Sequence, residues 1–247
     1  MKYKAHDYQA YATNFILEHP ISAVFLDMGL GKSIITLSAI FDLCLDSFLV
    51  RKVLVIAPLR VARDTWPAEI HKWDHLHGLT YSVAVGTEAE RKAALRQRVS
   101  VYIINRENVQ WLIEESGIPF DYDMVVIDEL SSFKSYQAKR FRTLLKVRPG
   151  IKRIVGLTGT PSSNGLMDLW AEFRILDMGK RLGRFIPSNW MRSSATSLPA
   201  GTSSRSARMK RSAFCGMGKY CPSLRWQIPH RRCERERAIS PCFLFRR

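Results

Sequence analysis

Between residues 7 and 176, short apolar runs typical of β-strands alternate with segments that have helical spacing. This alternation restricts the fold more than any other feature of the chain. Continuous apolar strands are buried on both faces, and their alternation with helices predicts a parallel sheet covered by helices on both sides. The predicted strands lie at 23–27, 53–58, 81–85, 101–105, 124–128 and 153–157.

The segments between these runs carry helix signals. Residues 7–19 have apolar side chains at helical spacing, and the pattern stops at Pro20. A second helix is expected over residues 32–46. Thr87 and Glu90 have the spacing of a capping box, which predicts a helix that begins directly after Thr87. The fold class that follows is α/β.

The end of the chain differs in composition. Residues 1–189 hold 25 Lys and Arg against 20 Asp and Glu, whereas residues 190–247 hold 13 against 2. This basic segment also contains nine serines and four of the five cysteines, without a sustained period. We therefore predict one folded domain over 1–185 and a tail over 186–247 that is disordered or the product of another reading frame.

Several classes of protein are disfavoured. No apolar run reaches the roughly 18 residues that a membrane span needs, and the opening MKYKAHDYQ lacks the apolar core of a signal peptide. A cytoplasmic protein without a membrane partner is expected. Five cysteines, an odd number with no C-x₂-C pair, favour neither a disulfide framework nor a zinc site.

The stretch LDMGLGKS, residues 26–33, follows a predicted strand and precedes a predicted helix. Gly29 and Gly31 would let backbone N–H groups turn toward phosphate oxygens, with Lys32 and Ser33 beside them. The general phosphate-loop pattern has a glycine where this chain has Leu26. The alternative is a tight strand-to-helix turn with an exposed lysine.

Two more motifs end apolar runs. MVVID is followed by a second carboxylate, so Asp128 and Glu129 stand together where they could hold Mg²⁺ and polarise water. A solvated acidic turn is the alternative. GLTGTP supplies the hydroxyls of Thr158 and Thr160 at the end of the last run. Taken alone, it is compatible with an ordinary loop.

In this order, YQ, LDMGLGKS, VIDE and GLTGTP resemble the first motor lobe of Swi/Snf-type DNA-dependent ATPases within helicase superfamily two. The continuation NGLMDLWAEFRILDMGKRLG is similar to phage and prophage members. That family typically has D-x-G-x-G-K-[ST], so Leu26 agrees with its pattern. The resemblance covers residues 3–185 and implies a single RecA-like lobe that binds ATP and Mg²⁺.

The resemblance implies roles for the nucleotide residues. Gln9 matches the glutamine that reads adenine, while Gly29 and Gly31 cradle the phosphates. Lys32 contacts the β- and γ-phosphates, and Ser33 binds Mg²⁺.

It also implies roles in hydrolysis and coupling. Asp128 binds Mg²⁺ and Glu129 acts in catalysis together with Lys32, although Leu130 and Ser131 replace the A and H of a DEAH-type box. That replacement puts the coupling role of the box's histidine in doubt. The motif that relays nucleotide state to DNA contacts is matched by Thr158, Gly159 and Thr160.

The segment APLRVARDTWPAEIHKW resembles the family's DNA-backbone motif. Candidate DNA contacts are Arg60 and Arg63, with Asn105 and Arg106 as weaker ones. Trp66 and Trp73 are predicted to pack in the core. The expected partner is double-stranded DNA, bound through its backbone without sequence preference.

Motors of this family use two lobes, and nothing after residue 185 resembles a second one. The sequence therefore predicts a truncated, nucleotide-binding lobe that is motor-incompetent alone, and a separate polypeptide could supply the other lobe. Two alternatives remain open: another phosphate-loop enzyme such as a small kinase, or a basic nucleic-acid-binding accessory protein without ATPase activity.

Overall fold

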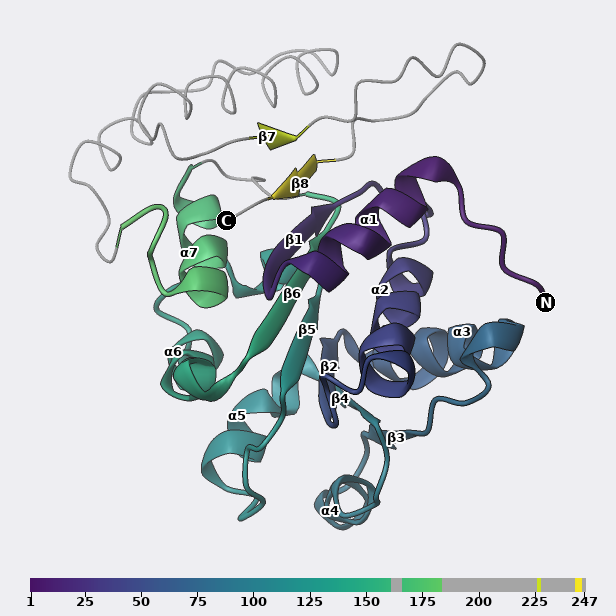
Figure 1. Cartoon of the computed structure of the whole chain (residues 1–247). Helices are drawn as coiled ribbons and strands as arrows, with labels where there is room; N and C mark the ends of the chain where they lie inside the picture. The colour runs from purple at the N-terminus through teal and green to yellow at the C-terminus, as the bar shows by residue number, and fades with distance from the viewer. Residues whose placement is uncertain (161–165, 184–225, 228–242, 246–247) are drawn as a thin grey trace, which may run out of the picture.

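The computed structural model describes residues 1–160, 166–183, 226–227 and 243–245. Its α-helices are α1 (Asp7–Glu18), α2 (Lys32–Phe41), α3 (Trp66–Lys72), α4 (Glu88–Leu95), α5 (Val109–Glu114), α6 (Lys139–Val147) and α7 (Leu166–Asp177). Its strands are β1 (Ile21–Phe25), β2 (Val53–Ala57), β3 (Tyr81–Ala84), β4 (Val101–Asn105), β5 (Met124–Asp128), β6 (Arg153–Thr158), β7 (Trp226–Gln227) and β8 (Phe243–Phe245). Figure 1 shows their arrangement.

The strands form one sheet in the order β3-β4-β2-β5-β6-β1-β8-β7. The first six in that order are all parallel, which confirms the predicted parallel sheet. Since the strands run in the same direction, their carboxyl ends lie along one edge of the sheet. Phe25 is paired with Thr158, and Asp128 with Leu157, so the ends of β1, β6 and β5 are adjacent.

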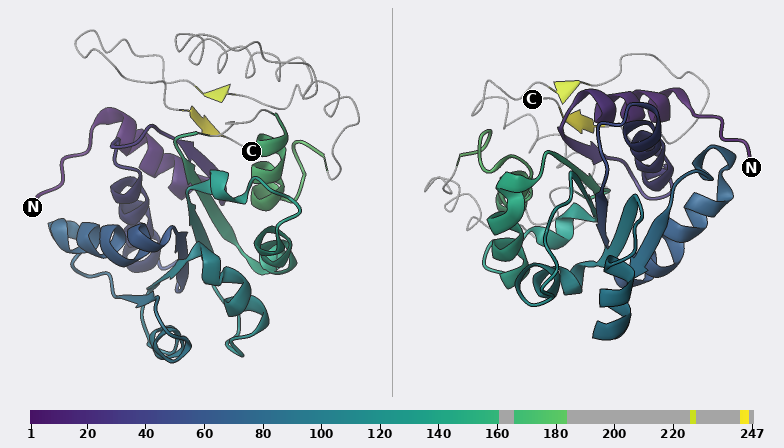
Figure 2. Two further views of the ribbon diagram at one scale, coloured as in Figure 1. Left: turned by 180° about the vertical axis from the view of Figure 1, so that it is seen from behind. Right: turned by 60° about the horizontal axis from the view of Figure 1, so that its bottom comes forward.

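Both faces of the sheet are covered by helices, with α1, α2 and α3 on one face and α5, α6 and α7 on the other (Figures 1 and 2). Alternation along each strand fills the two cores. In β2, Leu54 and Ile56 belong to one buried cluster, whereas Val53 and Val55 belong to the other. Strands that are apolar at every position therefore fit a sheet buried on both sides.

The local signals mostly locate the elements correctly. The Thr87 hydroxyl accepts a bond from the Glu90 amide, and the Glu90 carboxylate accepts one from the Thr87 amide, so α4 begins with the predicted capping box. The helix expected over 32–46 consists of α2 and one π-helical turn, Asp42–Asp46. β1 begins directly after Pro20, two residues earlier than predicted.

Most of the predicted tail, 186–247, lies outside the described residues. Within it the structure describes only β7 and β8, which pair antiparallel to each other, and β8 pairs antiparallel to β1. The boundary near residue 185 and the disorder of the tail remain predictions. Among the described helices, none combines the length and apolar character needed to cross a bilayer.

Candidate nucleotide and DNA site

The loop between β1 and α2 has the backbone of an anion cradle. Gly29 has φ of 83° and Gly31 has φ of 76°, a left-handed conformation that glycine adopts without strain. A Cβ on Gly31 would lie 2.6 Å from Nε2 of Gln9, so a larger residue there would have to displace the Gln9 side chain. α2 begins at Lys32, which places its free N–H groups and positive dipole end at the loop.

Lys32 is folded back onto this loop. Its ammonium donates to the carbonyl oxygen of Leu26 at 2.9 Å and to that of Asp27 at 3.1 Å. Both carbonyls belong to the residues that follow β1. The lysine is therefore held inside the loop by two bonds to backbone oxygens, where a phosphate oxygen could replace them.

Gln9 lies beside the same loop. Its Oε1 accepts from the His6 amide at 3.0 Å and from the Tyr3 hydroxyl at 3.3 Å, and its Nε2 donates to the Leu30 carbonyl at 3.5 Å. Gln9 is also buried. The amide is thus fixed in orientation next to Gly31, as a base-reading group would need to be.

Asp128, the last residue of β5, accepts a hydrogen bond at Oδ2 from the indole N–H of Trp66, with a donor–acceptor distance of 3.0 Å. Burial raises the pKa of the Asp128 carboxyl above its usual range, and the Glu129 charge acts in the same direction. The Trp66 bond and the Lys32 charge oppose that rise. Carboxylates with a perturbed pKa occur frequently at functional sites.

Glu129 has φ of 60°, which is rare for a residue other than glycine and typical of functional sites. Its Oε1 accepts a short hydrogen bond from the Ser131 hydroxyl and another from the Thr158 hydroxyl at 3.2 Å. Ser131 occupies the place of the histidine in a DEAH-type box. In this chain it contacts the second carboxylate of the motif directly.

The segment after β6 joins the two motifs. The buried Thr158 hydroxyl donates to Glu129 and accepts from the Thr160 amide at 3.1 Å. A Cβ on Gly159 would lie 3.3 Å from the Leu26 carbonyl oxygen, which also accepts from Lys32. The Thr158 carbonyl also accepts from the Leu26 amide at 3.2 Å, so the predicted coupling residues contact both the loop and Glu129.

The candidate DNA contacts follow β2 and β4 at the same edge. Arg60 and Arg63 are exposed, and the Arg63 guanidinium is paired with Asp64 at 2.9 Å. Arg106 is partly buried and paired with Glu107 at 2.8 Å. These three arginines lie beyond β5 from the nucleotide loop, because β2 and β4 follow β5 in the sheet order.

Asn105 is buried rather than presented at the surface. Its Nδ2 donates to Glu107 at 3.2 Å, and its Oδ1 accepts from Asn108 at 2.5 Å. In this structure Asn105 organises the turn after β4, while Arg106 is the partly exposed group there.

Two residues have environments that the sequence did not reveal. Trp66 is fully buried in the core, as predicted, but its indole also reaches Asp128. Glu172 on α7 is fully buried, and among the described residues its carboxyl oxygens have no hydrogen-bond partner. Burial raises the pKa of Glu172 to about 9, with Asp168 and Glu129 acting in the same direction and Lys134 against it. In the sequence, the signal for Glu172 is an acidic residue inside the mostly apolar segment LWAEFRIL.

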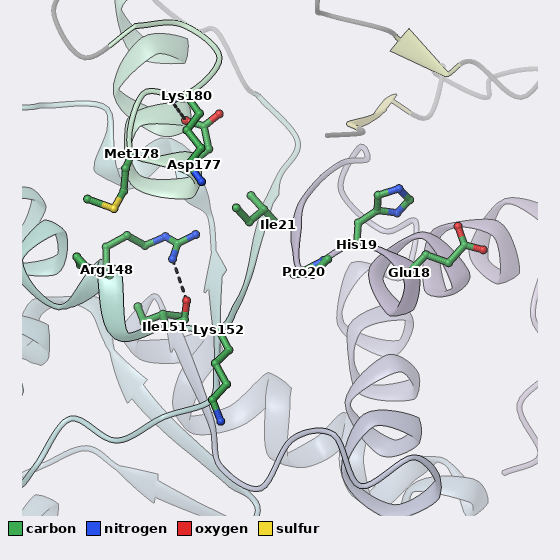
Figure 3. Close-up of a pocket in the computed structure, with 11 residues that line it drawn as sticks. Glu18, His19, Pro20, Ile21, Arg148, Ile151, Lys152, Asp177, Met178 and Lys180 are labelled. Atoms are coloured by element: carbon green, nitrogen blue, oxygen red, sulfur yellow. Dashed lines mark hydrogen bonds between the residues drawn. The ribbon is translucent and has the colours of Figure 1, made fainter.

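A pocket of 430 Å³ opens at the opposite, amino edge of the sheet (Figure 3). It is lined by the end of α1, the start of β1, the turn before β6 and the end of α7. Arg148 in its wall donates to the Ile151 carbonyl at 3.0 Å, and Lys152 is paired with Asp123 at 2.6 Å. None of the predicted site residues lines this pocket.

Comparison with known proteins agrees with the arrangement of the motifs. A family model described as an SNF2-related domain matches residues 17–210. Putative protein p41 of Acyrthosiphon pisum secondary endosymbiont phage 1 is 39% identical over 183 residues, which are 72% of this chain and 40% of that protein. The Mus musculus DNA excision repair protein ERCC-6-like is 33% identical over 165 residues, 64% of this chain and 13% of that protein.

Among solved structures, the Sulfolobus solfataricus SWI2/SNF2 ATPase core in complex with dsDNA superimposes with a TM-score of 0.63. Its identity is 24%, and the match covers 72% of this chain and 37% of that chain, so it shows a shared fold. This chain thus spans less than half the length of each of these three proteins.

Proposed function

Because the chain belongs to the family of proteins with an SNF2-related domain, we propose that it is the ATP-binding lobe of a DNA-dependent ATPase. One observation carries the proposal. Lys32, Asp128 and Glu129 come from distant parts of the chain and lie at the carboxyl ends of β1 and β5, two strands that are separated in the sheet by β6 alone. A phosphate loop facing two carboxylates is the arrangement that metal-assisted nucleotide hydrolysis needs.

The side chains present fit Mg·ATP. The loop from Gly29 to Ser33 offers backbone N–H groups at a helix start, and Lys32 can exchange its two carbonyl partners for phosphate oxygens. The Ser33 hydroxyl and the Asp128 carboxylate are the oxygen donors assigned to Mg²⁺, a cation that prefers such ligands. When bound, Mg²⁺ would neutralise charge on the phosphates.

We assign Glu129 the role of polarising the water that attacks the nucleotide. Its carboxylate is held by the hydroxyls of Ser131 and Thr158, which fix its orientation at the end of β5. Through Thr158 and Thr160 the same carboxylate is linked to the segment after β6. We assign to Thr158, Gly159 and Thr160 the relay between nucleotide and DNA.

Duplex DNA is the proposed polymer partner, contacted through its phosphates. Arg60, Arg63 and Arg106 form the candidate contact on the side of β2 and β4. The segment 190–247 holds 13 Lys and Arg against 2 acidic residues and should add an attraction that depends on salt. An accessory protein that binds nucleic acid would use the same charge, but the family match does not favour that alternative.

Hydrolysis by this chain alone should be very slow. In related phosphoryl-transfer enzymes an arginine from a second element raises the rate about 10³–10⁵-fold. The described residues form one lobe, so such an arginine would come from outside them. Steady-state turnover in the ordinary enzyme range of roughly 1–10³ s⁻¹ would contradict this part of the proposal.

Calorimetric titration of the intact chain with Mg·ATP and with Mg·GTP tests the proposal. We expect saturable binding of Mg·ATP and weaker binding of Mg·GTP, because Gln9 is fixed beside the loop to read adenine. A Gln9→Ala variant should bind the two nucleotides about equally. Duplex DNA binding without any Mg·ATP binding would instead favour the accessory protein.

A further inference from the structure

Trp66 links two parts of the chain that are 62 residues apart. It is the first residue of α3, its side chain is fully buried, and its indole N–H donates to Oδ2 of Asp128 at 3.0 Å. The preceding turn, Val61–Thr65, contains Arg63 and directly follows Arg60. The bond therefore joins a candidate DNA-contact segment to the carboxylate at the end of β5.

A second tryptophan in the same region, the partly buried Trp73, makes a different contact. Trp73 donates to Glu69 at 2.7 Å, a partner four residues earlier in its own segment. Trp66 reaches across to another strand instead. Buried indoles usually find some acceptor, but here the acceptor is the residue assigned to the metal.

The bond restricts the carboxylate. The terminal torsion of an aspartate is broad, so a carboxylate without a partner samples many orientations. One oxygen of Asp128 accepts a hydrogen bond from a ring that is fully buried in the core, and this narrows the range of orientations open to the carboxylate. Partners of this kind commonly change metal affinity 10–100-fold when they are removed.

We propose that Trp66 is a positioning residue, which orients Asp128 for Mg²⁺ through its indole N–H and connects that carboxylate to the segment carrying Arg60 and Arg63. The inference rests on the proposed function, because it presupposes that Asp128 serves a nucleotide-bound metal. It assigns Trp66 a role beyond the packing expected from the sequence.

The test compares ATP affinity in Mg²⁺ and in EDTA for the intact chain and its Trp66→Phe variant. Phenylalanine keeps an aromatic ring but removes the N–H. We expect affinity for metal-free ATP to stay within about twofold, and the gain in affinity on adding Mg²⁺ to fall at least about tenfold. A purely structural tryptophan would change the unfolding temperature but leave the Mg²⁺ gain intact.

Trp73→Phe is the matched control, since it also removes one indole N–H bonded to a carboxylate. Its Mg²⁺ gain should equal that of the parent chain. A Trp66→Phe variant that keeps the full Mg²⁺ gain would overturn the inference while leaving the proposed function standing. A parent chain without any Mg²⁺ gain would overturn both.

Loss of folding in Trp66→Phe would not end the test, because the parent chain gives a second measurement. One of its six indole N–H signals in the NMR spectrum should shift in Asp128→Asn and should also shift when Mg²⁺ is added to the ATP-bound chain. If the signal identified by Asp128→Asn does not move on adding Mg²⁺, the indole does not report the metal and the inference fails.

Discussion

At the amino edge of the sheet, Arg148 donates to the carbonyls of Ile175 and Leu176, and Arg153 donates to those of Ile16 and Leu17. At the carboxyl edge, Lys32 also donates to two carbonyls, but these belong to its own loop. At both edges, therefore, cationic side chains donate hydrogen bonds to backbone carbonyl oxygens.

The carbonyl acceptors at the two edges differ in their position in the structure. The carbonyls at the ends of α7 and α1 have no partner within their helices, so the two arginines satisfy groups that would otherwise be left unpaired. The carbonyls of Leu26 and Asp27 belong to a loop that a ligand could approach. The first kind of bond stabilises the fold, whereas the second can be exchanged for a phosphate. If the proposed function holds, position relative to the strand ends separates the structural arginines from the phosphate-binding lysine.

The largest expected effect is a difference in Mg·ATP affinity between alanine substitutions of one lysine at each edge of the sheet. Lys32→Ala should abolish measurable Mg·ATP binding in calorimetry, since Lys32 is the loop's point charge for the β- and γ-phosphates. Lys152→Ala, at the amino edge, removes an exposed ion pair with Asp123 and should leave that affinity unchanged. Equal affinity of Lys32→Ala and the parent chain would contradict the loop assignment.

The second prediction concerns Glu172, whose buried carboxyl group should make the stability of the protein depend on pH. The pKa of Glu172 is raised to about 9 from the ordinary 4.5, chiefly by burial. Between these two values the native chain keeps a proton that the unfolded chain has lost, so this group makes stability fall as pH rises. Glu172→Gln should remove that fall, which is at most about 1.4 kcal/mol per pH unit.

Urea unfolding at several values between pH 5 and pH 8 measures this slope. The variant should be more stable than the parent, and its advantage should grow with pH across the window. Glu115→Gln, at an exposed position, is the control and should follow the parent curve. An unchanged slope in Glu172→Gln would show that Glu172 is ionised in the folded protein.

Arg148 provides the opposite case at the amino edge. Arg148→Met keeps a long side chain but leaves carbonyls at the end of α7 without donors, which should lower the free energy of unfolding by about 2 kcal/mol. The exposed Arg142→Met should have little effect. The Mg·ATP affinity of folded Arg148→Met should match that of the parent. A loss of affinity without a loss of stability would mean that the two edges are not independent.

Features that depend on neighbouring residues could be predicted from the sequence. The strand runs, the glycines of the loop and the Thr87–Glu90 cap each act within a few residues, and the structure places them as the pattern indicates. Parallel strands then bring Asp128 to the edge where Lys32 lies, because every such strand ends on the same side. The candidate site therefore follows from strand direction together with short motifs.

Contacts between distant side chains could not be predicted in this way. An indole looks the same in the sequence whether it packs against leucine or donates to Asp128, so the Trp66 bond depends on how α3 lies against the sheet. Ser131 replaces a histidine, and only its distance to Glu129 shows that it contacts the carboxylate. The sequence predicts Asn105 as a weaker DNA contact, but it does not show that bonds to Glu107 and Asn108 hold this side chain in the turn after β4.

The smallest expected effect concerns the part of the carboxyl edge, after β2 and β4, that is proposed to contact DNA. Arg60 is exposed after β2, at the carboxyl edge, whereas the exposed Arg98 precedes β4, at the amino edge. If duplex DNA lies along the carboxyl edge, Arg60→Ala should lose one phosphate contact and reduce the slope of log K against log[salt] by about 0.9. Arg98→Ala should leave the slope unchanged.

The measurement uses both variants and the parent on two unrelated duplexes, with affinities of order 10⁻⁴–10⁻⁶ M expected at physiological salt. Equal reductions for both arginines would mean that DNA is attracted by net charge alone, and a strong preference for one duplex would reveal base readout that contacts to phosphate cannot provide.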